Sequence, residues 1–289
     1  MSDYIVRGHA AGGTVRAFAA DTTETVAEAM ERHFTYPVVT AALGRLLTAG
    51  AMMGSMMKGE DDLITLTVKG DGPIGNITVS ADSHGNVKGF AGNPQVEVPD
   101  KYAGKLDVGT AVGRGTLSVV MDLGLSDPYN GTVELQTGEI ADDLAYYFTV
   151  SEQTPSAVGL GVMIDTDSSV KHSGGFIIQM MPDVSEETIS AVESKLSDLK
   201  PVTSMMDEGM TPEMILEHIL GDLGLEITEH ADVRFHCNCS KERVSEALAT
   251  LNPGDIQEMI DDGETIEVKC FFCNTAYNFT VDELKELLG

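Results

Sequence analysis

The sequence predicts an α+β protein with a large antiparallel-sheet N-terminal domain that also contains helices, a helical linker and a small C-terminal domain. Three observations support this organisation. Alternating apolar and polar residues recur through the first 180 residues, the pattern becomes helical after Pro182, and all four cysteines lie in the last fifth of the chain. A length of 289 residues suggests about two folded domains. The predicted boundaries are 1–180, 181–230 and 231–289.

The N-terminal domain is expected to begin with a hairpin and two helices. Gly12 and Gly13 interrupt an alternating pattern, which is typical of a turn between two strands. Asp21 or Thr22 can cap the helix that follows. The expected elements are strands Tyr4–Ala10 and Thr14–Ala20 and helices Asp21–His33 and Val38–Met57.

The second of these helices has the apolar character of a membrane span, but Arg45 lies near its middle. A charge at the centre of a bilayer costs roughly 2.5 kcal/mol or more, which weakly apolar residues do little to offset. A buried core helix is therefore favoured. Four methionines recur in it at helical spacing and are interpreted as core filler, with a protein-binding surface as the alternative: Met52, Met53, Met56 and Met57.

An antiparallel sheet should follow, because alternating segments are joined by short turns. The expected strands are Leu63–Lys69, Ile77–Ala81, Val87–Phe90, Gly115–Met121, Gly131–Gln136, Ala157–Ile164 and Gly175–Met181, with a helix at Ile140–Val150. The G-x-G-x-x-G run at Gly70–Gly75 is interpreted as a turn, since a strand follows it and Pro73 lies inside it. The sequence has no Ser-His-Asp pattern, phosphate loop or H-E-x-x-H helix, so we do not expect an enzyme.

The linker is helical, acidic and rich in methionine. Ser185 can cap a helix over Glu186–Leu199, and Thr211-Pro212 can open another over Glu213–Leu220. The segment shows few signs of a core of its own, so it is either an ordinary connector or a metastable adaptor that must pack on its neighbours. In the second case its apolar residues are candidates for binding other proteins: Met205, Met206, Met210, Met214, Ile215 and Ile219.

The C-terminal domain combines two short helices, a hairpin and a last helix. Ser240 can cap the first helix, and Thr280–Glu283 has the pattern of a capping box for the last one. The expected elements are helices Lys241–Thr250 and Asp255–Asp261 and strands Thr265–Lys269 and Ala276–Phe279.

The four cysteines form a C-x-C pair, Cys237 and Cys239, and a C-x-x-C pair, Cys270 and Cys273, with 30 residues between the pairs. Two such pairs can converge on one tetrahedral zinc ion, and four sulfurs leave no open position for hydrolytic chemistry. His236 is an alternative ligand. A domain of under 60 residues usually needs such a staple, and oxidation of a thiolate would remove it as a donor. We therefore expect a zinc-binding domain that is sensitive to oxidation.

The net charge of −28 argues against nucleic acid and against an anionic membrane surface as partners, because both attract basic proteins. Residues 1–180 carry a net charge of −11, and the shorter remainder carries −17. The N-terminus lacks a basic segment followed by an apolar one, so no secretory signal is expected. Clustered thiols without such a signal predict a cytoplasmic protein, where thiols stay reduced.

The zinc motif His236-Cys237-Asn238-Cys239-Ser240 with Cys270-Phe271-Phe272-Cys273 is accompanied by three longer stretches, Asp3–Phe18, Thr65–Phe90 and Tyr129–Pro155. In this combination the sequence resembles the heat shock protein 33 family, whose members are redox-regulated holdase chaperones. The resemblance covers essentially the whole chain, and it is least diagnostic in the 180–230 connector.

The resemblance implies a mechanism. In the reduced form all four cysteines would bind one zinc ion and the chaperone would be inactive. Peroxide or hypochlorite would pair Cys237 with Cys239 and Cys270 with Cys273, so that zinc leaves and the C-terminal domain unfolds. The connector would then lose its packing and expose apolar surface that holds unfolding client proteins without ATP. The active form would be a homodimer.

The residues alone leave other functions open. A constitutive protein-binding module would keep zinc as a purely structural ion. A thiol oxidoreductase would use Cys270 and Cys273, although the βαβ setting typical of such enzymes is missing. A zinc-ribbon reader of nucleic acid is disfavoured by the negative charge.

Overall fold

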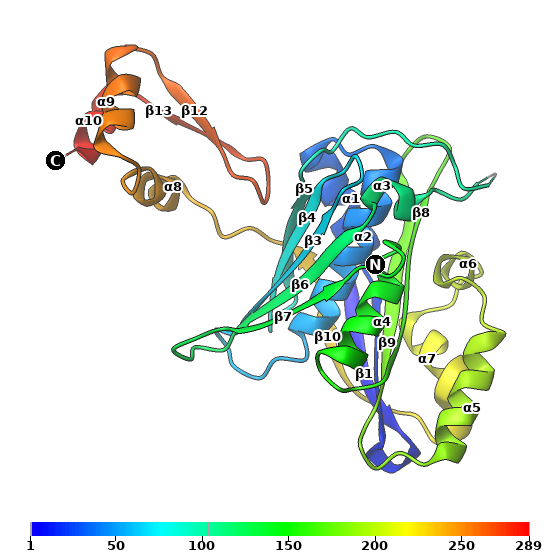
Figure 1. The fold of residues 1–289 in the computed structure, drawn as a ribbon. Coiled ribbons are helices and arrows are strands. Elements are labelled where there is room, and N and C mark those ends of the chain that lie inside the picture. The colour runs from blue at the N-terminus through cyan, green and yellow to red at the C-terminus, as the bar shows by residue number, and fades with distance from the viewer. Residues whose placement is uncertain (1, 103, 289) are drawn as a thin grey trace. The chain divides into compact units, whose positions relative to one another are not determined.

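The computed structural model describes residues 2–102 and 104–288. The chain divides into two compact units, Met1–His236 and Cys237–Gly289 (Figure 1). The first unit contains a five-stranded and a six-stranded sheet together with helices, and the second contains a two-stranded sheet with helices. The predicted α+β class with large antiparallel sheets is therefore confirmed.

The five-stranded sheet is antiparallel throughout, with the order β10-β1-β2-β9-β8. Its strands are β1 (Tyr4–Ala10), β2 (Val15–Asp21), β8 (Ser156–Ile164), β9 (Val170–Met180) and β10 (Glu226–Asp232). The predicted hairpin joins β1 to β2 through a short 3-10 turn, η1 (Ala11–Gly13). Gly12 and Gly13 adopt φ values of 65° and 91° there, a left-handed conformation that glycine tolerates without strain.

The six-stranded sheet has the order β11-β5-β4-β3-β6-β7, and only the β11–β5 pair is parallel. Its strands are β3 (Leu63–Gly70), β4 (Asn76–Asp82), β5 (Asn86–Ala91), β6 (Gly115–Asp122), β7 (Tyr129–Glu134) and β11 (Arg234–Phe235). The glycine run at 70–75 is the turn from β3 to β4, as predicted. A Cβ atom on Gly72 would lie 2.5 Å from the Ala111 carbonyl oxygen, so glycine there allows a close backbone approach.

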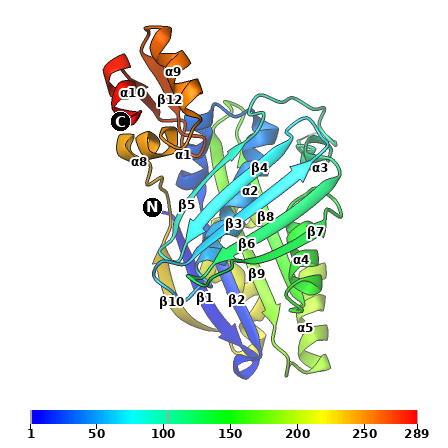
Figure 2. The ribbon, with the colours of Figure 1, turned by 60° about the vertical axis from the view of Figure 1, so that its left-hand side comes forward.

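Helix α2 (Pro37–Gly54) is the core of the first unit. It contacts strands of both sheets, and Figure 2 shows it between them. By length and composition it could cross a membrane, but 89% of its apolar window is buried inside the protein, as expected of a core helix. Helix α1 (Thr23–His33) packs beside it. The buried carboxylate of Asp3 lies at the N-terminus of α1, where it accepts hydrogen bonds from the backbone N–H groups of Glu24 and Thr25.

A layer of three helices covers the other face of the five-stranded sheet. The helices are α5 (Glu186–Ser197), α6 (Val202–Asp207) and α7 (Pro212–Leu220), followed by the short η2 (Gly221–Leu223). Their buried side chains form one cluster with side chains of β1, β2 and β9. The chain then returns to the sheet as β10, which pairs with β1. The predicted boundary between 230 and 231 falls inside this strand.

Some elements differ from the prediction. Helices α3 (Val108–Val112) and α6 and strand β10 were not predicted, because they are short or, in β10, mostly polar and exposed. Strand β9 begins five residues before the predicted Gly175, since pairing with β8 extends it through polar residues. Helix α4 (Ala141–Val150) agrees with the prediction within one residue.

The second unit contains α8 (Lys241–Leu248), α9 (Pro253–Asp261), β12 (Ile266–Lys269), β13 (Ala276–Phe279) and α10 (Val281–Leu287). The predicted capping box is present, because Thr280 and Glu283 exchange side-chain and backbone hydrogen bonds. The buried core of this unit consists of one side chain from each helix and one from β13: Leu248, Ile256, Phe279 and Leu284.

Candidate metal centre

The first cysteine pair lies just before α8. Ser240 caps this helix, since its Oγ accepts a hydrogen bond from the Arg243 backbone N–H at 3.3 Å. The Arg243 guanidinium in turn donates to the Asn238 carbonyl oxygen at 2.9 Å, between the two cysteines. The helix start therefore holds the backbone of the C-x-C segment in place.

The second pair lies at the tip of the β12–β13 hairpin. The Cys270 N–H donates to the Thr275 carbonyl at 2.9 Å, and the Asn274 N–H donates to the Cys270 carbonyl at 2.7 Å. Asn274 adopts a left-handed φ of 57°, which asparagine tolerates better than most residues. This tight turn brings the Cys270 and Cys273 side chains close together.

The four sulfurs, all free thiols, lie within 4.8 Å of one another. The Cys237 and Cys270 sulfurs are 3.8 Å apart, and the Cys239 and Cys273 sulfurs are 3.3 Å apart. Zinc–sulfur bonds of about 2.3 Å in a tetrahedron place sulfurs about 3.8 Å apart, so the cluster has the size of a metal site. His236 is not part of it. The His236 side chain is exposed, and its backbone N–H donates to the Val87 carbonyl in the first unit.

The electrostatics of the cluster favour a cation. Burial and neighbouring cysteines raise the pKa of Cys237 and of Cys270. Burial also acts to raise the pKa of Cys273, but hydrogen bonds from Thr275 and from other cysteines outweigh it and lower this pKa to about 7. Because one thiolate opposes the ionisation of its neighbours, a positive ion is needed to hold all four as thiolates.

Two hydroxyl groups that the sequence analysis did not single out contact the sulfurs. The Tyr277 hydroxyl donates to the Cys239 sulfur at 3.1 Å. The Cys273 sulfur and the Thr275 hydroxyl oxygen are 3.2 Å apart; the neutral thiol donates to this oxygen, and the hydroxyl donates to the sulfur when Cys273 is ionised. The lysines close in sequence to the cysteines form their ion pairs with carboxylates. Lys241 pairs with Glu283 and lies over the Phe279 ring, and Lys269 pairs with Glu267.

A family model for Hsp33 proteins matches residues 3–280. The chain belongs to the Hsp33 family. It is 62% identical over 287 residues, 99% of this chain and 100% of the relative, to a protein of Agathobacter rectalis named 33 kDa chaperonin. A 33 kDa chaperonin of Thermoanaerobacter is 50% identical over 289 residues, 100% of this chain and 98% of the relative. The crystal structure of the 33 kDa chaperonin of Thermotoga maritima matches with a TM-score of 0.93 at 37% identity, covering 100% of this chain and 98% of the other.

Membership of the Hsp33 family supports a chaperone function, and chaperones of this kind are generally not enzymes. The six residues predicted as candidates for binding clients lie in or next to α6 and α7. Four of them are buried against the five-stranded sheet: Met205, Met206, Ile215 and Ile219. Met210 is partly buried in the same cluster, and the Met214 side chain is 50% exposed.

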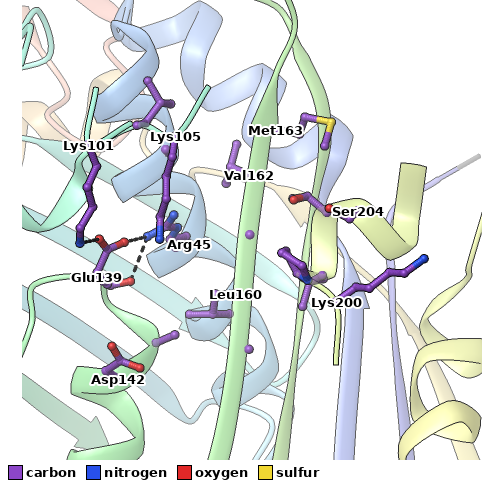
Figure 3. A pocket seen from close by; sticks show the side chains of 18 of the residues that line it. Arg45, Lys101, Lys105, Glu139, Asp142, Leu160, Val162, Met163, Lys200 and Ser204 are labelled. Atoms are coloured by element: carbon purple, nitrogen blue, oxygen red, sulfur yellow. Dashed lines mark hydrogen bonds and ion pairs between the residues drawn. The ribbon is translucent and has the colours of Figure 1, made fainter. Parts of the chain in front are cut away.

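A groove of about 1100 Å³ beside β8 is a second feature of this Hsp33 chain (Figure 3). Glu139 lies between two cations there: Arg45 contacts its carboxylate at 2.8 Å and Lys101 at 3.2 Å. Burial acts to raise the pKa of Glu139, but hydrogen bonds and charge attraction from both cations lower it. The Glu139 carboxylate offsets one of these two positive charges, and we assign the three side chains a structural role.

Proposed function

We propose that this chain is a redox-regulated, ATP-independent holdase that binds unfolding proteins under oxidative stress. The observation that carries the proposal is the cluster of four free thiols in a separate unit, in which four side chains of the described residues form the buried apolar cluster. A unit of this size gains only a few kcal/mol from its core. Its folding can therefore depend on the state of its cysteines.

In the proposed inactive form, Cys237, Cys239, Cys270 and Cys273 hold one zinc ion. Bound zinc would supply about 10–16 kcal/mol of folding free energy, as in small zinc peptides, and would keep the sulfurs as thiolates. Oxidation of the cysteines to disulfides removes these donors. The second unit would then unfold, because its core alone does not stabilise it.

The proposed disulfides are Cys237–Cys239 and Cys270–Cys273. The sulfur contacts at 3.8 Å and 3.3 Å join cysteines of different pairs, so the proposed pairing does not rest on distance in the folded unit. It is supported by chain proximity instead. Each proposed pair lies within a few residues, so its sulfurs stay close once the unit begins to unfold, whereas the contacts between pairs separate.

The helix layer α5–α7 is the proposed client-binding segment. Cys237 directly follows His236, the residue anchored to Val87, so unfolding of the second unit reaches the end of the first through the chain. Release of the layer would expose its own apolar residues and the sheet face beneath it, including Val6 and Ala17. We propose that the active form is a cytoplasmic homodimer and that neither nucleic acid nor membranes are partners.

The test compares reduced, metal-loaded protein with protein treated with peroxide. Metal analysis of the reduced form should find one zinc ion per chain; iron or no metal would overturn the zinc assignment. Light scattering of a heat-aggregating client should show suppression by the oxidised form only. Equal suppression by both forms would instead favour a constitutive zinc-stapled binding module.

A further inference from the structure

The contacts around the four sulfurs are unequal within each cysteine pair. In the C-x-C pair the Tyr277 hydroxyl contacts Cys239, and in the C-x-x-C pair the Thr275 hydroxyl contacts Cys273. Both hydroxyls come from β13 or the turn just before it. Among the cysteine contacts of the described residues, side-chain hydroxyls thus reach one sulfur of each pair.

Solvent access follows the same division in the second pair. Cys273 is buried, with 3% of its surface exposed, whereas Cys270 is only partly buried. A dissolved oxidant therefore reaches Cys270 more easily. In the first pair both cysteines are partly buried, so there the Tyr277 hydroxyl is the main difference.

A hydroxyl that donates to a thiolate lowers the reactivity of that sulfur. When Cys273 is ionised, its sulfur can no longer donate, and the Thr275 hydroxyl becomes the donor. The hydrogen bond stabilises the negative charge and draws electron density from the sulfur, so attack on an oxidant becomes slower. Such donors are also needed because four thiolates around a dication leave a net negative charge in an acidic unit.

We infer that Tyr277 and Thr275 are positioning residues that protect Cys239 and Cys273, so that Cys237 and Cys270 are the sulfurs that peroxide attacks first. This inference rests on the proposed redox function. The attacked thiolate displaces hydroxide from hydrogen peroxide and becomes a sulfenic acid. The protected thiolate of the same pair then attacks that sulfur and releases a second hydroxide. Two thiolates are oxidised to one disulfide, and one peroxide is reduced to two hydroxide ions.

The experiment treats reduced, zinc-loaded full-length protein with less than one equivalent of peroxide in the presence of dimedone, which traps sulfenic acid. Peptide mass spectrometry should place most dimedone on Cys237 and Cys270. In Tyr277→Phe the share on Cys239 should rise, and in Thr275→Val the share on Cys273 should rise. Zinc release, followed with a chromogenic chelator, should be about threefold to tenfold faster in both variants. In the wild-type protein the hydroxyl stabilises the thiolate, and part of this stabilisation is lost when the sulfur attacks the oxidant; the variants lack the hydroxyl and do not meet this cost.

Controls separate this role from simple packing. Thr250→Val removes a hydroxyl that bonds the Ala247 carbonyl at the end of α8 and should leave the dimedone pattern unchanged. Thr275→Ser keeps a hydroxyl and should restore the wild-type pattern. In the cobalt-substituted protein, Tyr277→Phe should shift the sulfur-to-cobalt charge-transfer bands, which a packing change alone would not do. The zinc affinity of Tyr277→Phe should also fall by about tenfold.

Two outcomes overturn the inference in distinguishable ways. If wild-type protein releases zinc on oxidation but both variants give the wild-type dimedone pattern, the assignment of Tyr277 and Thr275 is wrong and the redox function stands. If peroxide releases no zinc from the wild-type protein, the redox function itself fails and the inference fails with it.

Discussion

Substitution of Leu216 by alanine tests the proposal that packing of the helix layer on the sheet keeps the protein inactive. Leu216 lies on α7, is 0% exposed, and packs in the cluster between the layer and the five-stranded sheet. A buried leucine truncated to alanine costs about 3–4 kcal/mol, from lost burial and the cavity that remains. Each kcal/mol shifts the melting temperature of a domain this large by about 2–4 °C, so the first unit should melt about 6–16 °C lower.

The lost burial energy weakens the packing of the helix layer on the five-stranded sheet. Reduced, zinc-loaded Leu216→Ala protein should therefore suppress client aggregation without any oxidant, measured by light scattering at a temperature where the wild-type protein is inactive. Its zinc content should stay at the wild-type level, because the four cysteines are unchanged.

Met214 provides the matched control on the same helix. Its side chain is 50% exposed, so Met214→Ala should change stability by less than about 0.5 kcal/mol and give no activity in the reduced form. The reasoning is refuted if Leu216→Ala melts at the expected lower temperature and still shows no aggregation suppression. Release of the layer would then not be the activating event.

Three further predictions concern the sulfur cluster and the buried charges. Cys239→Ser removes one of four ligands and should weaken zinc binding and lower the melting temperature of the second unit; full zinc stoichiometry with unchanged melting would contradict this. A strong zinc chelator should abolish the circular dichroism signal of the second unit while the first unit keeps its melting transition, since the proposed zinc ion is bound by the second unit alone. Glu139→Gln should destabilise the first unit by about 3 kcal/mol at neutral pH, because it leaves Arg45 partly uncompensated. Since the folded pKa of Glu139 lies below its ordinary 4.5, its stabilisation is present above pH 4.5 and is lost as the pH falls through the folded value, so urea unfolding should show the variant and wild type converging in acid.

Local signals in the sequence predicted much of the fold. The glycine turn before β2, the apolar period of α2 and the capping box at Thr280 are each determined by a few neighbouring residues, and the structure confirms them. Strand β10 escaped prediction because its side chains are mostly exposed and its place depends on backbone pairing with distant β1. The cysteine cluster was foreseeable from spacing. The contact of Tyr277 with Cys239 was not, since it depends on how the hairpin and the C-x-C segment meet.

The layer of helices and the sulfur cluster are held by different forces, and in the proposed function this difference would account for switching without ATP. The layer is held mainly by apolar burial, supplemented at its edge by Glu213, which accepts a hydrogen bond from Tyr4 at 3.0 Å and pairs with His230 at 2.9 Å. The layer contains no cysteine, so oxidation to disulfides acts on the sulfur cluster and not on the layer. In the proposed function, the free energy of thiol oxidation at the sulfur cluster would replace that of ATP hydrolysis. If the layer is the client-binding segment, as proposed, the apolar side chains that pack it on the sheet are those that a client would bind, so clients and the sheet would compete for one surface.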